Sequence, residues 1–206
     1  MKHKLAICII ALGLLGFFAG CGRIVNWGKS NFYQGKKVKK YESIPKTFVR
    51  SVTVYDQLDT QAMFDVLLLS NEVRTSYADA YALKRGKTLQ QKQLFLRRQL
   101  EENNHFISFY ILAPHKILLS QTDTPWQILL EIDGEMYHPI EIKEVDLPYE
   151  YQSFFGKKFN RFKTVYLVKF DAKDIDDEKI IDKQTQLVEL HFRSIDKHVT
   201  LAWEFV

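Results

Sequence analysis

The spacing of apolar residues along the chain changes near residue 105. From residue 59 to 103 they recur every three to four positions, which predicts two amphipathic helices, over 59–83 and 88–103. The segment 84–87, Lys-Arg-Gly-Lys, has the cations and the glycine that suit a helix end. A strand over 47–55 precedes the helices, because β-branched and aromatic residues alternate there with polar ones.

The second of these helices is polar over most of its surface. Leu89, Leu96 and Leu100 form one narrow apolar stripe. We therefore expect a surface helix that packs by this stripe.

In the second half of the chain, apolar positions alternate with polar ones, as in strands that bury one face. Residues 105–113 are apolar on both faces and predict a central, buried strand. Asp133-Gly134 predicts a hairpin between a strand over 126–132 and a return strand over 140–143. Three more strands are predicted, over 164–170, 187–193 and 199–205.

This order of elements predicts the fold class α+β. An N-terminal strand and a two-helix segment, residues 47–104, would precede an antiparallel β-sandwich, residues 105–206. The length of 206 residues and the hydrophobic content of 46% suit a folded domain with its own core.

The first 21 residues differ from the rest of the chain. Lys2 and Lys4 precede an uncharged apolar run over 5–18 that leads into the motif Phe18-Ala19-Gly20-Cys21. The run is shorter than the roughly 20 residues that span a bilayer, and small residues follow it, as in signal peptides. The motif resembles the lipobox of bacterial lipoproteins, with Phe18 where that family most often has Leu.

This resemblance implies cleavage between Gly20 and Cys21 and a diacylglycerol on the Cys21 thiol. Residues 1–20 would be the signal peptide, and lipid would hold the mature protein to a membrane of the cell envelope. Gly22 in place of Asp favours the outer membrane, facing the periplasm, or the outer face of the plasma membrane in a cell with a single membrane. The alternative is an uncleaved N-terminal anchor with a free Cys21.

Charge is distributed unevenly along the chain. Residues 21–46, which would carry the lipidated Cys21, form a basic linker that contains glycines. Residues 22–50 have eight basic side chains against one acidic, whereas 51–206 have 19 basic against 24 acidic. The linker is either a tether that attracts anionic headgroups or a solvated spacer. No strongly basic face is evident in the folded part, so nucleic-acid binding is not expected.

Residues 154–163 combine four phenylalanines with four cations. Their rings would either insert into a membrane interface or stack on a partner, or the segment would be a long loop that folds its rings over the core. The contact patch would consist of Phe154, Phe155, Lys157, Lys158, Phe159, Arg161 and Phe162. Exposure of the rings decides between the two, because a large exposed apolar patch marks an interaction site.

Metal binding and catalysis are weakly indicated. His191 and His198 flank the last predicted hairpin and, with Glu189 or Glu204, have the residue types of a metal site, but a cross-strand polar pair is the preferred interpretation.

The acidic stretch 171–182 has Lys179 where an EF-hand needs glycine, so it predicts a solvated loop. The chain has no GxSxG motif or phosphate-binding loop, and Cys8 and Cys21 are its only cysteines. We expect no catalytic residue, no metal and no cofactor.

In the order of their elements, residues 47–206 resemble uncharacterised bacterial lipoproteins with an immunoglobulin-like C-terminal half. The likeness has no diagnostic motif and carries over no catalytic residue. We expect a lipid-anchored, non-catalytic envelope lipoprotein that acts by protein–protein contact with an envelope partner. The alternative is a small-ligand or lipid-binding protein with an apolar cavity under its helices, and an envelope hydrolase is the third hypothesis.

Overall fold

Two antiparallel sheets and a layer of helices form the part of the chain that the structure, a computed structural model, describes: residues 47–205 without 58, 175 and 183. The fold is therefore α+β. In chain order its elements are β1 (Val49–Asp56), β2 (Asp59–Leu68), α3 (Asn71–Lys84), α4 (Leu89–Glu102), β3 (Phe106–Pro114), β4 (Gln127–Ile132), β5 (Glu135–Tyr137), β6 (Glu141–Glu144), α5 (Tyr149–Phe155), the short 3-10 helix η1 (Gly156–Lys158), β7 (Lys163–Asp171), β8 (Leu187–Arg193) and β9 (His198–Glu204).

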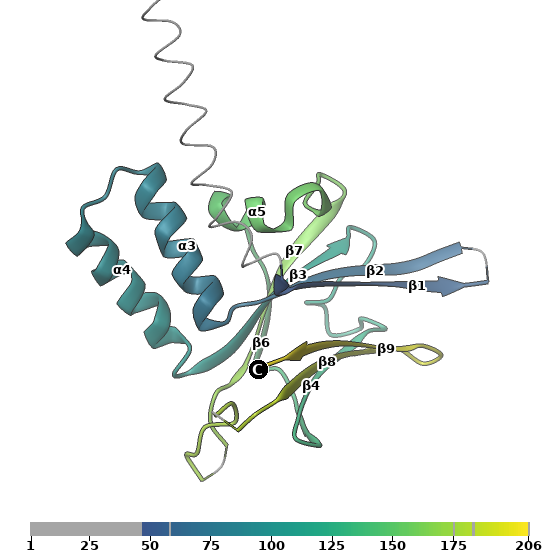
Figure 1. The fold of residues 1–206 in the computed structure, drawn as a ribbon. Helices are drawn as coiled ribbons and strands as arrows, with labels where there is room; N and C mark the ends of the chain where they lie inside the picture. Colours follow the sequence, from purple (N-terminus) through teal and green to yellow (C-terminus); the bar gives the residue numbers. More distant parts are fainter. Residues whose placement is uncertain (1–46, 58, 175, 183, 206) are drawn as a thin grey trace, which may run out of the picture. The chain divides into compact units, whose positions relative to one another are not determined.

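The strands form a five-stranded sheet in the order β1-β2-β3-β7-β6 and a four-stranded sheet in the order β5-β4-β8-β9 (Figure 1). β3 is the central strand of the larger sheet, as the apolar pattern over 105–113 predicts. Because β1 and β2 join this sheet, residues 47–104 and 105–206 share it. The two segments that the sequence separates are thus parts of one core.

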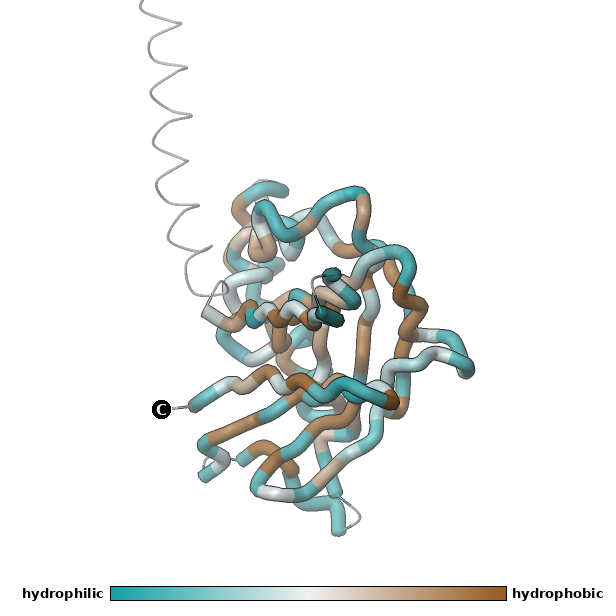
Figure 2. The backbone as a smooth tube through the Cα atoms, turned by 90° about the vertical axis from the view of Figure 1, so that its right-hand side faces the viewer, coloured by the Kyte–Doolittle hydropathy of each residue, from teal (hydrophilic) through white to brown (hydrophobic). Residues whose placement is uncertain are grey.

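The main hydrophobic core lies between the two sheets. Alternate residues of each strand point into it, and Phe64 of β2 stacks on Phe192 of β8 with ring centroids 4.1 Å apart. At the edge, the indole Nε1 of Trp203 donates a hydrogen bond to the Phe48 carbonyl oxygen at 2.7 Å. Figure 2 shows hydrophobic stretches along the strands of both sheets and hydrophilic ones in the connecting loops.

α3 and α5 cover the other face of the five-stranded sheet. Tyr77 of α3 stacks on Tyr151 of α5 at 4.1 Å, and Tyr151 meets Phe154 edge-on at 5.6 Å. These rings pack on Leu67 of β2, Leu112 of β3, Val165 of β7 and Leu69, which follows β2. The described part of the chain therefore has three layers, and the centre of the larger sheet is covered on both faces.

The predicted break between the two helices is confirmed. Thr88 caps α4 in a capping box with Gln91, and Gly86 adopts a positive φ of 59° just after α3. The predicted start of the first helix is wrong, since residues 59–68 form strand β2 and α3 begins only after the Ser70 cap. Apolar residues at helical spacing in this segment fit a strand equally well, because β2 buries both faces.

α4 lies at the surface, as expected, and of its leucine stripe Leu96 and Leu100 are half-buried. Phe95 stacks on Tyr81 of α3 at 4.4 Å, and Glu102 pairs with the buried Arg74 of α3 at 3.0 Å. Leu89, at the start of the stripe, is 66% exposed. The helix docks by its aromatic and charged side because α3 presents tyrosines and Arg74 there.

Two further expectations from the sequence are wrong in detail. The strand that returns from the Asp133-Gly134 turn is the three-residue β5, and the chain then crosses to the other sheet, where β6 pairs with β7. Pro139 lies at this crossing, where it interrupts the hairpin because it has no N–H to donate. The second error concerns the loop suggested for residues 154–163, since Phe154 and Phe155 belong to the helix α5.

Candidate functional site

The phenylalanine- and lysine-rich segment is divided between core and surface. Phe154 is 1% exposed and Phe155 is 4% exposed, and both pack in the layer between α5 and the sheet. Phe159 is partly buried against the same cluster. These three rings are therefore not a free contact patch, because α5 directs Phe154 and Phe155 toward the sheet and Phe159 packs on the same cluster.

Four other residues of the segment are exposed and form what we call the basic turn: Lys157, Lys158, Arg161 and Phe162. Phe162 is 65% exposed, and the Arg161 guanidinium lies over its ring at 4.9 Å. The turn connects α5 to β7, so cations and one aromatic ring project from the rigid three-layer core.

A buried carboxylate holds the base of the basic turn. Asp65 of β2 is 2% exposed and pairs with Lys163, and Lys158 Nζ lies 3.6 Å from its Oδ1. Ser51 donates its hydroxyl hydrogen to Asp65 and accepts a hydrogen bond from Lys158. The cluster is an anchor that ties the turn to β1 and β2.

A second exposed group lies where α3 ends, α4 begins and α5 begins. We call it the hairpin tip, and it consists of Leu83, Lys84, Arg85, Lys87, Leu89 and Tyr149. Lys84 Nζ lies over the Tyr149 ring at 4.4 Å, and Arg85 lies over Tyr81 at 4.3 Å and 4.0 Å from Glu150. Leu83, Leu89 and Tyr149 are all exposed.

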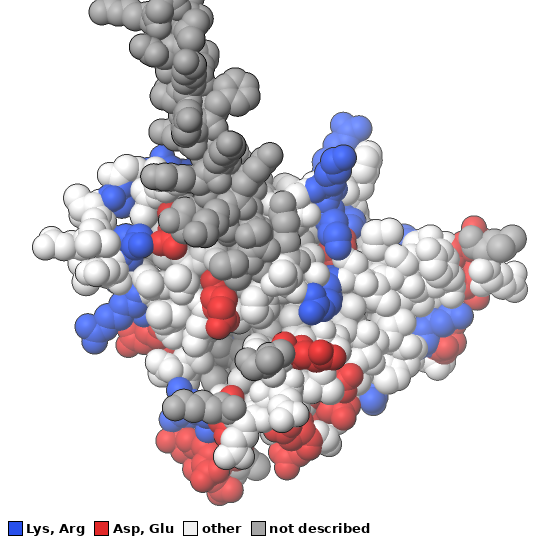
Figure 3. All heavy atoms as spheres, viewed as in Figure 1, with Lys and Arg blue, Asp and Glu red and all other residues white. Residues whose placement is uncertain are grey.

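The hairpin tip and the basic turn lie at the two ends of α5, along one side of the described domain (Figure 1). Figure 3 shows blue cations over these two regions, whereas red carboxylates gather at the opposite, lower end. We call the two regions together the contact surface. It combines exposed Leu, Tyr and Phe side chains with cations, the mixture of apolar, aromatic and Arg side chains found in protein interfaces.

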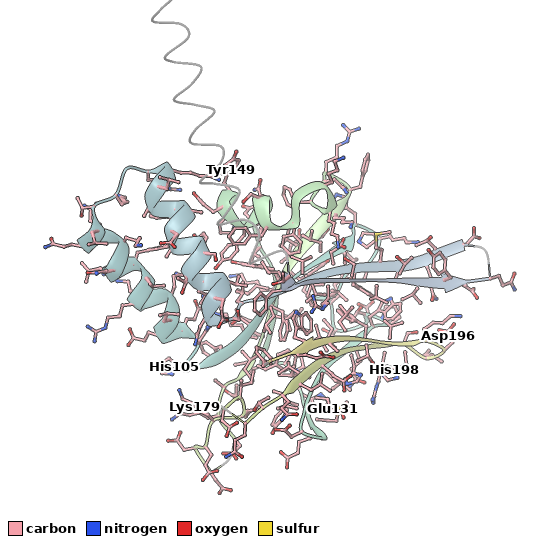
Figure 4. All side chains as sticks on the ribbon, viewed as in Figure 1. His105, Glu131, Tyr149, Lys179, Asp196 and His198 are labelled. Atoms are coloured by element: carbon pink, nitrogen blue, oxygen red, sulfur yellow. The ribbon has the colours of Figure 1, made fainter. Side chains whose placement is uncertain are left out.

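The two histidines of the last hairpin lie next to each other on the outer face of the four-stranded sheet. His191 Nδ1 lies 3.0 Å from His198 Nε2 and 2.9 Å from the Thr200 hydroxyl. Desolvation, followed by the charges of Arg193 and His191, lowers the pKa of His198 below its ordinary value. Glu131 of β4 approaches His191 from the other side, and Figure 4 shows Glu131 and His198 on this sheet. The sequence suggested the two histidines but not Glu131.

The acidic stretch 171–182 uses its carboxylates within its own loop. Asp174 accepts hydrogen bonds from the backbone N–H groups of Asp176 and Glu178, both at 2.9 Å. Asp177 pairs with Lys173 at 2.6 Å. These contacts fit a solvated loop, because the two side chains are directed to the backbone and to a lysine.

A partly enclosed cavity of about 220 Å³ lies where α3 begins, lined by Leu69, Asn71, Asn103, Ser108 and Lys179 among others. It is smaller than the roughly 300–1,000 Å³ of typical ligand pockets, and its lining is half polar. The space between the helices and the sheet is filled by aromatic rings. The ring packing under the described helices thus favours a surface function over a lipid cavity at that place.

The expected cleavage and lipidation sites, Gly20 and Cys21, lie outside the described residues. Within the described part of the chain, none of the helices has the length and apolarity needed to cross a bilayer. No protein-family model, no curated protein and no solved structure matches the chain.

Proposed function

We propose that this chain is a lipid-anchored, non-catalytic cell-envelope lipoprotein that works by protein–protein contact through the contact surface. The observation that carries the proposal is the grouping of exposed Leu83, Leu89, Tyr149 and Phe162 with six cations along one side of the domain. The anchor is Cys21, supported by the apolar run and the lipobox-like motif before it. The outer membrane, facing the periplasm, is the favoured location.

A protein partner suits this surface better than a bilayer does. Two acyl chains on Cys21 anchor a protein stably by themselves, so the domain need not add membrane affinity. Exposed tyrosine and arginine are the side chains that most often dominate binding energy in protein interfaces. The partner would present carboxylates and an apolar recess, complementary to the cations and to rings such as Phe162.

The remaining expectations stand as alternatives of lower support. A ligand-binding role would use the 220 Å³ cavity, which suits a small polar molecule better than a lipid. An immunoglobulin-like arrangement of residues 105–206 and an envelope hydrolase remain predictions from the sequence. Two antiparallel sheets pack face to face, which supports a sandwich-like class but not the immunoglobulin-like arrangement in particular.

Lipidation gives the first test. In cells fed an alkyne analogue of palmitate, the wild-type chain and the Cys8→Ser variant are expected to carry label, and Cys21→Ser is expected to carry none. Cys8 is the matched control, because it is the only other cysteine and would leave with the signal peptide. Label on Cys21→Ser, or none on the wild type, would refute the anchor.

The contact surface gives the second test. A photo-crosslinking amino acid at Phe162 or Leu89 is expected to capture one protein in intact cells, whereas the same probe at Ile195, which is fully exposed on the β8–β9 turn, is expected not to. Charge reversal by Arg161→Glu or Lys87→Glu should reduce capture at least tenfold.

The control for charge reversal is Lys173→Glu, which lies in the acidic loop after β7, at the opposite end of that strand from the basic turn. It should leave capture unchanged. If all three variants capture the same protein as the wild type does, the contact surface is not the binding site.

A further inference from the structure

A cluster that the proposed function does not use lies on the outer face of the four-stranded sheet. β4 and β8 are neighbours in this sheet, with Glu131 opposite Glu189 and Leu129 opposite His191. Their outward side chains therefore converge, and one ligand atom from each of Glu131, Glu189 and His191 lies within 4.8 Å of the other two.

His191 has one satisfied nitrogen and one unsatisfied nitrogen. Its Nδ1 contacts Thr200 and His198, as described above. Its Nε2 is buried and makes no hydrogen bond, although Glu131 Oε2 is only 2.9 Å away. The oxygen thus lies off the axis along which an Nε2–H group would donate. The whole side chain is 95% buried, so bulk water does not satisfy this nitrogen either.

This off-axis position fits a cation shared by the two atoms. A metal ion bound about 2.0–2.2 Å from both would subtend roughly a right angle between atoms 2.9 Å apart. The metal would then lie on the Nε2 axis, and the carboxylate oxygen would lie to one side of that axis. A buried nitrogen that makes no hydrogen bond to a nearby oxygen costs free energy. The same placement of the two atoms is normal when both bind one metal ion.

The two glutamates give a second reason to expect a bound cation. Like charges directly opposite on neighbouring strands destabilise a sheet. Among the described residues, Glu189 makes no ion pair and Glu131 pairs only with His191. Their row of the sheet continues with Met136 and Ala202, which bring no positive charge. A bound cation would remove this repulsion.

We propose that His191 Nε2, Glu131 and Glu189 bind a divalent transition-metal ion, with Thr200 and His198 orienting the imidazole from Nδ1. An imidazole with two carboxylates is a ligand set for Zn²⁺ or Mn²⁺, whereas Ca²⁺ and Mg²⁺ prefer oxygen ligands alone. Zn²⁺ binds such a set more tightly than Mn²⁺. The site differs from the one suggested by the sequence, because Glu131 replaces His198 as a ligand. Of the two glutamates suggested there, Glu189 is the ligand, and His198 contacts the imidazole at Nδ1.

The test is metal titration of the full chain, purified in detergent and stripped with a chelator. Calorimetry with Zn²⁺ is expected to show one ion per chain, and an excess of Mg²⁺ should not compete. Glu131→Gln and Glu189→Gln should each weaken binding at least tenfold, with Glu204→Gln as the matched control on the neighbouring strand.

Thermal unfolding distinguishes a lost ligand from a damaged fold. Without metal, Glu189→Gln should unfold at the same temperature as the wild type or higher, because it removes one of two opposed charges. At the same Zn²⁺ concentration, the wild type and Glu204→Gln should gain more stability than Glu131→Gln and Glu189→Gln. Substoichiometric Zn²⁺ binding by the wild type, or equal Zn²⁺ affinity in the wild type and Glu189→Gln, would overturn the proposal.

Discussion

Replacing Asp65 with alanine is expected to lower the free energy of unfolding by about 3–5 kcal/mol, because it leaves a buried lysine without its counter-charge. The Lys163 side chain is 10% exposed, and Asp65 is its only ion-pair partner among the described residues. Urea unfolding of the full chain, followed by circular dichroism, measures the loss. The same substitution should also free the basic turn from β2, because Lys158 loses a partner too.

Asp79→Ala is the matched control for this prediction. Asp79 also pairs with a lysine, Lys92, at 2.7 Å, but both side chains reach solvent. Its removal should cost less than about 1 kcal/mol. A double variant, Asp65→Leu with Lys163→Met, should recover most of the stability, since apolar residues of similar size often replace a buried ion pair at little cost. Equal losses for Asp65→Ala and Asp79→Ala would contradict the structural role of Asp65.

Phe154→Ala is expected to destabilise the fold by about 3–5 kcal/mol, whereas Phe162→Ala should change stability by less than about 0.5 kcal/mol. The two rings lie in one segment of sequence but in different surroundings. Phe154 packs against Tyr151 under α5, and Phe162 is 65% exposed in the basic turn. Truncating the first leaves a cavity, and truncating the second removes only surface.

The pair of variants also separates structure from binding. Phe162→Ala should reduce partner capture by a crosslinker placed at Leu89 while leaving the unfolding midpoint unchanged. Phe154→Ala should lower the midpoint. If Phe154→Ala does not change stability, the segment is not packed as described. Phe154 would then again be a candidate contact residue.

Local signals in the sequence predicted the parts of the fold that depend on few residues. Thr88 and Gln91 mark the start of α4 by themselves, since a capping box needs only side chains and backbone three residues apart. The turn at Asp133-Gly134 is equally local, with φ values of 52° and 85° that this pair adopts readily. The central strand β3 was predictable because both of its faces are apolar.

The errors arise where partners distant in sequence decide the structure. Residues 59–68 carry apolar side chains that suit a helix or a doubly buried strand, and only pairing with β1 and β3 selects the strand. The same holds for the sites. The nearness of His191 and His198 follows from a short hairpin, but Glu131 meets His191 only because β4 pairs with β8. Asp65 and Lys163 are almost a hundred residues apart.

The hydrogen bond between Trp203 and Phe48 affects how the domain responds to a pulling force. β1 is an edge strand, so a force applied through residue 47 would peel it from β2 one rung at a time if nothing else held it. The indole hydrogen bond to Phe48 and the bond from Arg50 to the Ala202 carbonyl, at 3.0 Å, fasten that first stretch to β9. A pull applied through residue 47 therefore loads both sheets at once, and we expect the domain to resist it as a single unit.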